Sequence, residues 1–258
     1  MNSDLKEIKS NMLKMAHYSH ASHIGAALSC VDLLYCIYKN FADITSQNVF
    51  SIDRDKVILS KGHASIALYA VLAEFGLLDK EKLKQYYIDG GVLPGHLDKD
   101  SEAAVDCSAG SLGHGLPIAI GMALANPKRK VFVIMGDGEI QEGSVWEGII
   151  FAGKNPLKNL TIVIDKNNLQ AFGKTTEVAN YSSLKSTFNN FGLNAYEIDG
   201  HNISEIYSIL GKKSEKTKII IANTIKGHGI SFMENQLKWH YKSPNDEELE
   251  KALKEVNK

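Results

Sequence analysis

Residues 131–138 read Val-Phe-Val-Ile-Met-Gly-Asp-Gly, an apolar run that leads directly into a glycine–aspartate–glycine turn. The run has no alternation of apolar and polar positions, which is typical of a parallel strand covered on both faces. The glycines on either side of Asp137 allow the backbone to approach a ligand closely. The stretch therefore predicts a buried strand that presents a carboxylate at the carboxyl end of a sheet, where open α/β sheets bind ligands.

Four further short runs are rich in apolar residues, and most of them share this character. They occupy residues 56–59, 160–164, 195–198 and 218–222. Stretches with helical periodicity alternate with the strands, at residues 64–74, 116–125, 145–152, 181–191 and 203–210. This alternation predicts the α/β class, a doubly wound and mostly parallel sheet with helices on both faces.

Both ends of the chain are predicted to be helical or partly helical. An apolar stripe indicates the first helix: Leu5, Ile8, Met12 and Met15. Ser29, followed by an apolar run, predicts the start of a second helix, and the tail from Asp246 reads as a polar helix or a frayed end. We expect one domain over residues 1–258, with N-terminal helices at about 3–40 and a tail from about 244.

Composition excludes several classes of protein. The formal net charge is -1, from 29 Lys plus Arg against 30 Asp plus Glu, which argues against nucleic-acid or anionic-membrane partners. No apolar run approaches the roughly 20 residues that span a bilayer, and the start lacks the apolar core of a secretory signal. Three cysteines without C-x-x-C spacing indicate neither a disulfide framework nor a zinc site, so we expect a cytoplasmic protein.

A second polar group follows the strand predicted at residues 160–164, where the sequence continues Asp-Lys-Asn-Asn. If the two strands are neighbours, Asp137 and Asn167 project into one crevice. Carboxylate, amide and backbone oxygens suit a hard cation such as Mg²⁺, with phosphate oxygens completing its shell. Either motif alone would read as an ordinary turn, so the interpretation depends on the pair, 30 positions apart with a helix between.

This pair resembles the signature of thiamine diphosphate enzymes, in which GDG is followed about thirty residues later by Asn. The resemblance implies that Asp137, the side chain of Asn167 and the backbone carbonyl of Leu169 ligate Mg²⁺ or Ca²⁺. It also implies that Gly136 and Gly138 contact the cofactor.

Further motifs are similar to those of transketolases. Residues 59–65 resemble S-x-G-H-A/G-S, residues 93–96 resemble T-P-G-H, residues 109–115 resemble G-P-L-G-Q-G, and residues 120–123 match V-G-M-A. Glu142 matches the glutamate of GDG-x-x-x-E-G, and Trp239-His240 stands where the family has a His-Gly pair. The motifs follow the family order from His23 to about Pro244, so nearly the whole chain is covered.

The resemblance implies an enzyme that moves a two-carbon ketol unit from a ketose phosphate to an aldose phosphate. His63 and His240 are then expected at the diphosphate and the reacting centre, and His23 and His96 at substrate hydroxyls. Imidazoles suit such proton transfers near neutral pH.

The glycine-rich motif and Glu142 carry further implied roles. Gly110, Leu112 and Gly113 are expected to wrap the cofactor, and Glu142 to lie at a dimer interface near it. His114 replaces the family's glutamine and Tyr241 replaces a glycine, departures that bear on substrate preference. Four histidines outside the motifs are expected to be surface or satisfied core residues: His17, His20, His201 and His228.

Transketolases have two domains beyond the diphosphate-binding one, and we expect those on another polypeptide. A C-terminal transketolase subunit would supply the pyrimidine-binding domain and its glutamate, within a homodimer or an α2β2 assembly. Alternatives are a ketol transferase of a dedicated sugar-biosynthesis pathway, a 2-oxo acid dehydrogenase α-like chain, and a non-catalytic partner subunit. No G-x-G-x-x-G follows the first strand, which disfavours a dinucleotide-binding dehydrogenase.

Overall fold

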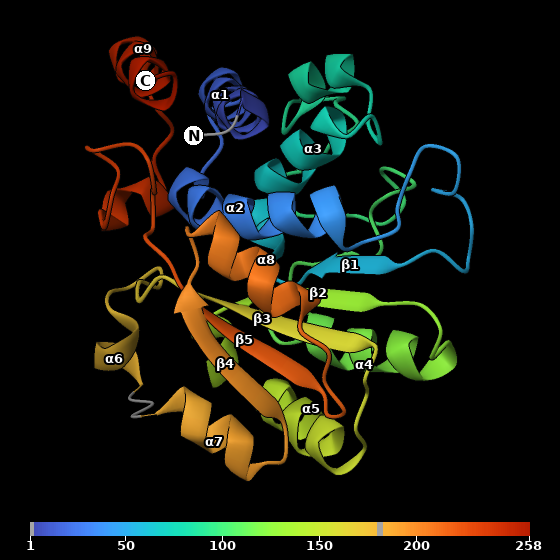
Figure 1. The fold of residues 1–258 in the computed structure, drawn as a ribbon. Helices are drawn as coiled ribbons and strands as arrows, with labels where there is room; N and C mark the ends of the chain where they lie inside the picture. Colours follow the sequence, from blue (N-terminus) through green and yellow to red (C-terminus); the bar gives the residue numbers. More distant parts are fainter. Residues whose placement is uncertain (1–2, 180–182) are drawn as a thin grey trace.

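A five-stranded parallel sheet forms the centre of the computed structural model, which describes residues 3–179 and 183–258 (Figure 1). The order across the sheet is β1-β2-β3-β5-β4. The strands are β1 (Lys56–Leu59), β2 (Val131–Gly136), β3 (Leu160–Lys166), β4 (Asn194–Asp199) and β5 (Lys218–Asn223). All five predicted strands are therefore confirmed, with ends shifted by two residues or fewer.

Helices cover both faces of this sheet. One face is covered by α2 (Ile24–Asn40), α3 (Ser65–Glu74) and α8 (Ile203–Gly211), with α1 (Ser3–Tyr18) and α9 (Asp246–Val256) further out. The other face is covered by α4 (Gly115–Ala125), α5 (Gly143–Lys154) and α7 (Leu184–Asn190). A short helix, α6 (Thr175–Val178), follows β3. This arrangement confirms the predicted α/β class.

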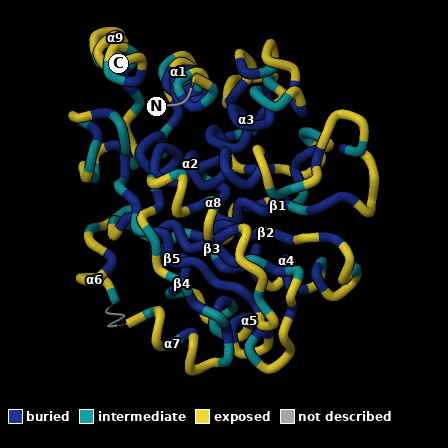
Figure 2. The backbone as a smooth tube through the Cα atoms, in the orientation of Figure 1, coloured by how far each residue is buried: buried dark blue, intermediate teal, exposed yellow. Residues whose placement is uncertain are grey.

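The strand residues explain why the apolar runs are continuous. In β2, Phe132 and Ile134 belong to the core beneath α2, whereas Val131, Val133 and Met135 belong to the core beneath α4 and α5. Successive side chains point to opposite faces of a strand, so a strand covered on both sides needs apolar residues at every position. Figure 2 shows β1, β2, β3 and β5 as the buried interior of the molecule, whereas the edge strand β4 is partly exposed.

The predicted start of the second helix at Ser29 is wrong. Helix α2 begins at Ile24, directly after His23, whose φ of 71° places it in the left-handed region. Ser29 lies inside the helix, buried, and its hydroxyl donates a hydrogen bond of 2.6 Å to the Asp165 carboxylate. The Ser29 hydroxyl, which the sequence pattern suggests as a helix cap, instead donates a hydrogen bond to the buried Asp165 carboxylate, 136 positions away.

The tail is an ordered helix. A capping box begins α9, because the side chain of Asn245 accepts from the backbone of Glu248 and the Glu248 side chain accepts in return. Leu249, Ala252 and Val256 are buried, and Figure 1 shows α9 beside α1.

The helix predicted at residues 181–191 is seen from Leu184 onward, and its predicted first residues lie outside the described residues. No helix in the described part of the chain is long and apolar enough to cross a membrane.

Two glycines give a matched test of how closely the backbone packs. A Cβ at Gly62, in the 3₁₀ helix η1 (Gly62–Ala64), would lie 1.8 Å from the carbonyl oxygen of Ala109, whereas one at Gly121 would meet no atom within 4 Å. Gly62→Ala should lower the free energy of unfolding by at least about 2 kcal/mol. Gly121→Ala, inside α4, should raise it by up to about 1 kcal/mol. Denaturant titrations measure both, and equal midpoints for the two variants would contradict the close approach of residues 62 and 109.

Candidate active site

Neighbouring strands bring the predicted cation ligands together. Strands β2 and β3 pair in parallel, with Gly136 opposite Asp165, so Asp137 and Asn167 follow adjacent strand ends. Both residues are buried, and both line one cavity of about 460 Å³ together with Leu169. The expected juxtaposition of Asp137 and Asn167 is therefore present.

Hydrogen bonds fix the orientation of these ligand groups. One oxygen of Asp137 accepts from the backbone of Asn168 at 2.7 Å and from the hydroxyl of Thr175 at 2.9 Å. The side-chain oxygen of Asn167 accepts from the backbone of Leu169 at 3.1 Å. Asn168 adopts a φ of 61°, the left-handed conformation that turns the chain sharply between the two ligand residues.

The charge environment of Asp137 fits a bound cation. Burial, and then the nearby Asp165 carboxylate, raise the pKa of Asp137 above its ordinary value. A raised carboxyl pKa means that the negative charge is under-compensated, which a divalent cation would relieve. Carboxylate, amide and backbone carbonyl oxygens are also the donors that hard cations prefer.

The cavity collects the residues named from sequence motifs. Of the predicted site residues, only Gly113 does not line it. The others that do so, besides the three ligands, are His23, His63, His96, Gly110, Leu112, Gly136, Gly138, Glu142 and His240. Gly113 lies behind the wall, where its backbone N–H donates to Glu139 at 2.8 Å.

Four histidines from separate segments meet at this cavity. The ring of His23 lies 4.8 Å from that of His240, 5.2 Å from that of His63 and 5.9 Å from that of His96. The backbone N–H of His23 also donates to the His240 carbonyl at 2.9 Å, which ties the start of α2 to the 3₁₀ helix η4 (Leu237–His240).

Three of these imidazoles are neutral at pH 7. Burial, followed by neighbouring positive charges, lowers the pKa of His23 to about 4 and that of His240 to about 3. Burial and Lys61 likewise hold the pKa of His63 well below its usual value. A neutral imidazole can accept a proton at one nitrogen and donate from the other, so the set can take part in proton transfer.

A buried ion pair supports the floor of the cavity, and the motifs assigned neither partner a role. Lys61 donates to the Asp165 carboxylate at 2.5 Å, and both side chains are almost fully buried. Asp165 also accepts from the hydroxyls of Ser29 and Thr224. Burial alone would lower the pKa of Lys61, but the Asp165 carboxylate raises it above its ordinary value. Lys61 therefore stays charged.

Glu139 is a second buried group that the motifs did not single out. Its carboxylate accepts from the backbone of Gly113 at 2.8 Å, from the backbone of Gly136 at 3.2 Å and from the hydroxyl of Ser60. Burial raises the pKa of Glu139. One carboxylate thus joins the turn at residues 136–138 to the glycine-rich loop.

Lys226 brings a positive charge to the cavity wall. Its side chain is almost fully buried, and its ammonium lies 3.3 Å from the carbonyl oxygen of Leu169 and 3.0 Å from Nδ1 of His240. Burial, and then repulsion from Lys61, lower the pKa of Lys226 to about 8. A single lysine beside a glycine-rich stretch gave no signal in the sequence, because only the fold brings it to Leu169 and His240.

The site is that of an α/β cofactor-binding domain, with oxygen donors and lysines at the strand ends suited to an anionic group held through a cation. Residues 5–256 match the family model described as transketolase, thiamine diphosphate binding domain, so the chain belongs to the transketolase family. The resemblance drawn from the motifs is confirmed.

Known relatives include separate subunits and complete enzymes. The chain is 38% identical over 240 residues to an apulose-4-phosphate transketolase subunit of Actinobacillus succinogenes, covering 91% of this chain and 87% of that protein. It is 37% identical over 243 residues to a 6-deoxy-6-sulfo-D-fructose transketolase subunit of Clostridium sp., covering 92% of this chain and 88% of that one.

The solved transketolase of Campylobacter jejuni superposes with a TM-score of 0.88 at 29% identity, covering 98% of this chain. The present chain spans only 42% of the length of that enzyme.

Proposed function

We propose that this chain is the diphosphate-binding subunit of a two-chain, thiamine diphosphate-dependent transketolase. The observation that supports it most is the meeting of Asp137, Asn167 and Leu169 at adjacent strand ends beneath a cluster of neutral histidines. The two relatives named as transketolase subunits have nearly the same length as this chain, which supports a division of the enzyme between two polypeptides. We also propose that residues 1–258 form a single domain.

In this proposal a divalent cation, Mg²⁺ or Ca²⁺, is held by Asp137, the side chain of Asn167 and the carbonyl of Leu169. The cofactor, when bound, supplies the electron sink for breaking a carbon–carbon bond. Lys226 and Lys61 place positive charge near its anionic end, while Gly110 and Leu112 wrap it.

The histidines handle protons at defined atoms. Because Lys226 donates to Nδ1 of His240, the hydrogen of this imidazole is on Nε2, which can donate to a ligand oxygen. In His23 the Nδ1 atom is engaged by the hydroxyl of Ser22 at 2.7 Å, which leaves Nε2 for the substrate. We assign His23 and His96 to substrate hydroxyls, and His63 and His240 to the diphosphate and the reacting centre.

The proposed reaction moves a two-carbon ketol unit between sugar phosphates. A dedicated sugar pathway is the second candidate, because two relatives are named for apulose 4-phosphate and 6-deoxy-6-sulfo-D-fructose rather than for a pentose phosphate. His114 and Tyr241, which replace a glutamine and a glycine of the family motifs, also favour a substrate that differs from that of other transketolases.

Helices α4 and α5 provide a surface for the partner subunit. The sequence of α4 contains no charged or hydrogen-bonding side chain, and Gly148 of α5 lets the two helices pack closely. Their outer faces expose four large apolar residues: Ile118, Leu124, Ile150 and Phe151. Glu142, which lines the cavity, directly precedes α5, so this surface continues from the site. Apolar patches of this kind mark interaction sites.

Asp137→Asn tests the cation site. The amide keeps the size of the carboxylate but removes its charge, so affinity for Mg²⁺ and thiamine diphosphate should fall at least about 100-fold. Isothermal titration calorimetry measures the affinity, and circular dichroism checks that the fold persists. Asp53→Asn, at the opposite end of the sheet, is the matched control and should bind as the unmodified chain does. Normal binding by Asp137→Asn would refute the proposed ligand.

Charge on the apolar surface tests the partner's position. Ile118→Glu and Ile150→Glu should each weaken association with the chain that carries the pyrimidine-binding domain by at least about 100-fold, because a carboxylate would be buried unpaired. Analytical ultracentrifugation of mixtures measures this association. Ile52→Glu, an exposed apolar residue before β1, should leave it unchanged. If the α4 and α5 variants still assemble normally, the partner docks elsewhere.

A further inference from the structure

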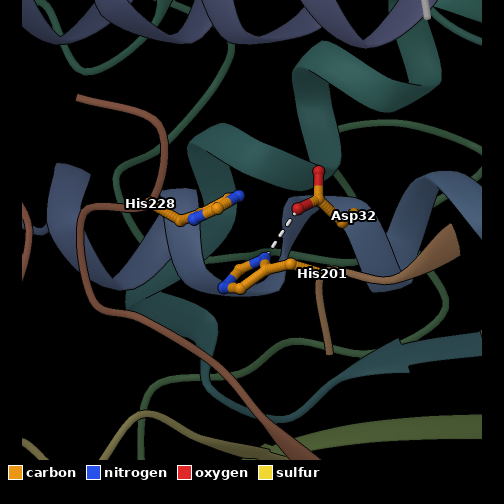
Figure 3. Close-up of side chains that lie close together, drawn as sticks. All are labelled: Asp32, His201 and His228. Atoms are coloured by element: carbon orange, nitrogen blue, oxygen red, sulfur yellow. Dashed lines mark hydrogen bonds and ion pairs between the residues drawn. The ribbon is translucent and has the colours of Figure 1, made fainter. Parts of the chain in front are cut away.

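A partly buried polar cluster lies outside the cavity, between α2 and the segments that follow β4 and β5. Its members are Asp32 on α2, His201 after β4 and His228 after β5, which Figure 3 shows close together. Their candidate ligand atoms all lie within 4.8 Å of one another, the spacing of a metal site. From the sequence, His201 and His228 are expected to be surface or satisfied core residues.

The contacts around this cluster argue against a metal ion. The ammonium of Lys9 lies 3.1 Å from one oxygen of Asp32, with both side chains buried, so a positive charge is already present. Both nitrogens of His201 are engaged as well: Nδ1 lies 2.7 Å from Asp32, and Nε2 accepts from the backbone of Ile225 at 2.9 Å. The rings of His201 and His228 stack 3.5 Å apart at 16°, so their in-plane nitrogens do not converge on one point.

These bonds determine the tautomer of His201. Because Nε2 accepts the N–H of Ile225, the ring hydrogen is on Nδ1, where it is donated to Asp32. A carboxylate that accepts from one imidazole nitrogen orients the ring and fixes which nitrogen remains an acceptor. Lys9 in turn compensates the charge of Asp32. The chain of contacts therefore runs from Lys9 through Asp32 and His201 to the backbone of Ile225.

Ile225 directly precedes Lys226, the buried lysine of the cavity wall. The hydroxyl of Thr224 is bound to Asp165, and the N–H of Gly227 donates to the carbonyl of Gly25 at 2.9 Å. His201 holds the backbone between these two anchor points. Displacement of Ile225 would move the backbone from which Lys226 reaches Leu169 and His240.

We propose that His201 is a positioning residue, which holds the 224–227 segment so that Lys226 projects into the cavity toward the anionic end of the cofactor. The cofactor part of this inference rests on the proposed function. The positioning of the segment does not, since it is a property of the chain without a ligand.

Hydrogen–deuterium exchange of the 258-residue chain without cofactor tests the positioning. His201→Ala should speed exchange in a peptide covering residues 224–229 by about 5- to 10-fold, the effect of one hydrogen bond. His201→Gln should bring the rate back to within about 3-fold of the unmodified chain, because its side-chain oxygen can accept from Ile225. His17→Ala is the matched control. His17 binds the carbonyl of Pro244 at 2.9 Å, outside this segment, and its loss should leave residues 224–229 unchanged.

Several exchange results would overturn the proposal. The first is an unchanged exchange rate at residues 224–229 in His201→Ala. The second is an equal increase in exchange rate along the whole chain. The third is an exchange rate in His201→Gln as fast as in His201→Ala. A Zn²⁺ site that is lost in His228→Ala would also overturn it, because the cluster would then be a metal centre.

A double-mutant cycle tests whether His201 acts through Lys226. Calorimetry would compare affinity for Mg²⁺ and thiamine diphosphate in the unmodified chain, His201→Ala, Lys226→Met and the double variant. We expect His201→Ala to weaken binding by about 10-fold alone and by less than about 2-fold in the Lys226→Met background. If the fold losses in affinity of the two single variants multiply in the double variant, His201 does not act through Lys226 and the proposal is contradicted. If the unmodified chain binds no thiamine diphosphate either alone or with the partner subunit, the proposed function fails, and the exchange result alone decides the positioning role.

Discussion

The ion pair between Lys61 and Asp165 is the constraint on which the site depends. It lies at the carboxyl edge of the sheet and is almost fully buried, with Ser29 and Thr224 adding hydrogen bonds to the same carboxylate. A buried charge pair stabilises only when its geometry is good and its remaining hydrogen-bonding groups are satisfied. Here the pair fixes the end of β1 and the end of β3 relative to α2 and β5, and the cavity lies between these elements.

The sequence predicted most of the fold because its strands are buried on both faces. Continuous apolar runs such as residues 131–135 have few alternatives to a parallel strand, and every site residue named from the motifs except Gly113 lies in the cavity wall. Ser29 was misread because a local pattern of hydroxyl and apolar residues resembles a cap, while its actual partner, Asp165, is 136 positions away. Lys226 and His201 could not be identified, because their contacts join segments distant in sequence.

The site combines positive charge with neutral proton carriers. Lys61 and Lys226 favour an anionic group, and the low pKa values of His23 and His240 keep imidazoles uncharged beside them. The carboxylates of Asp137 and Glu139 hold turns of glycine-rich backbone against the same cavity. In the proposed function each of these features serves the diphosphate end of the cofactor, and the apolar surface of α4 and α5 is the proposed docking surface of the second chain.

Ketol transfer by separately purified chains tests this account most directly. The 258-residue chain would be assayed with Mg²⁺, thiamine diphosphate, a ketose phosphate and an aldose phosphate, alone and with increasing amounts of the chain that carries the pyrimidine-binding domain. The account predicts no turnover by either chain alone and a rate that saturates when the two are present in equal amounts. Full turnover by this chain alone would contradict it.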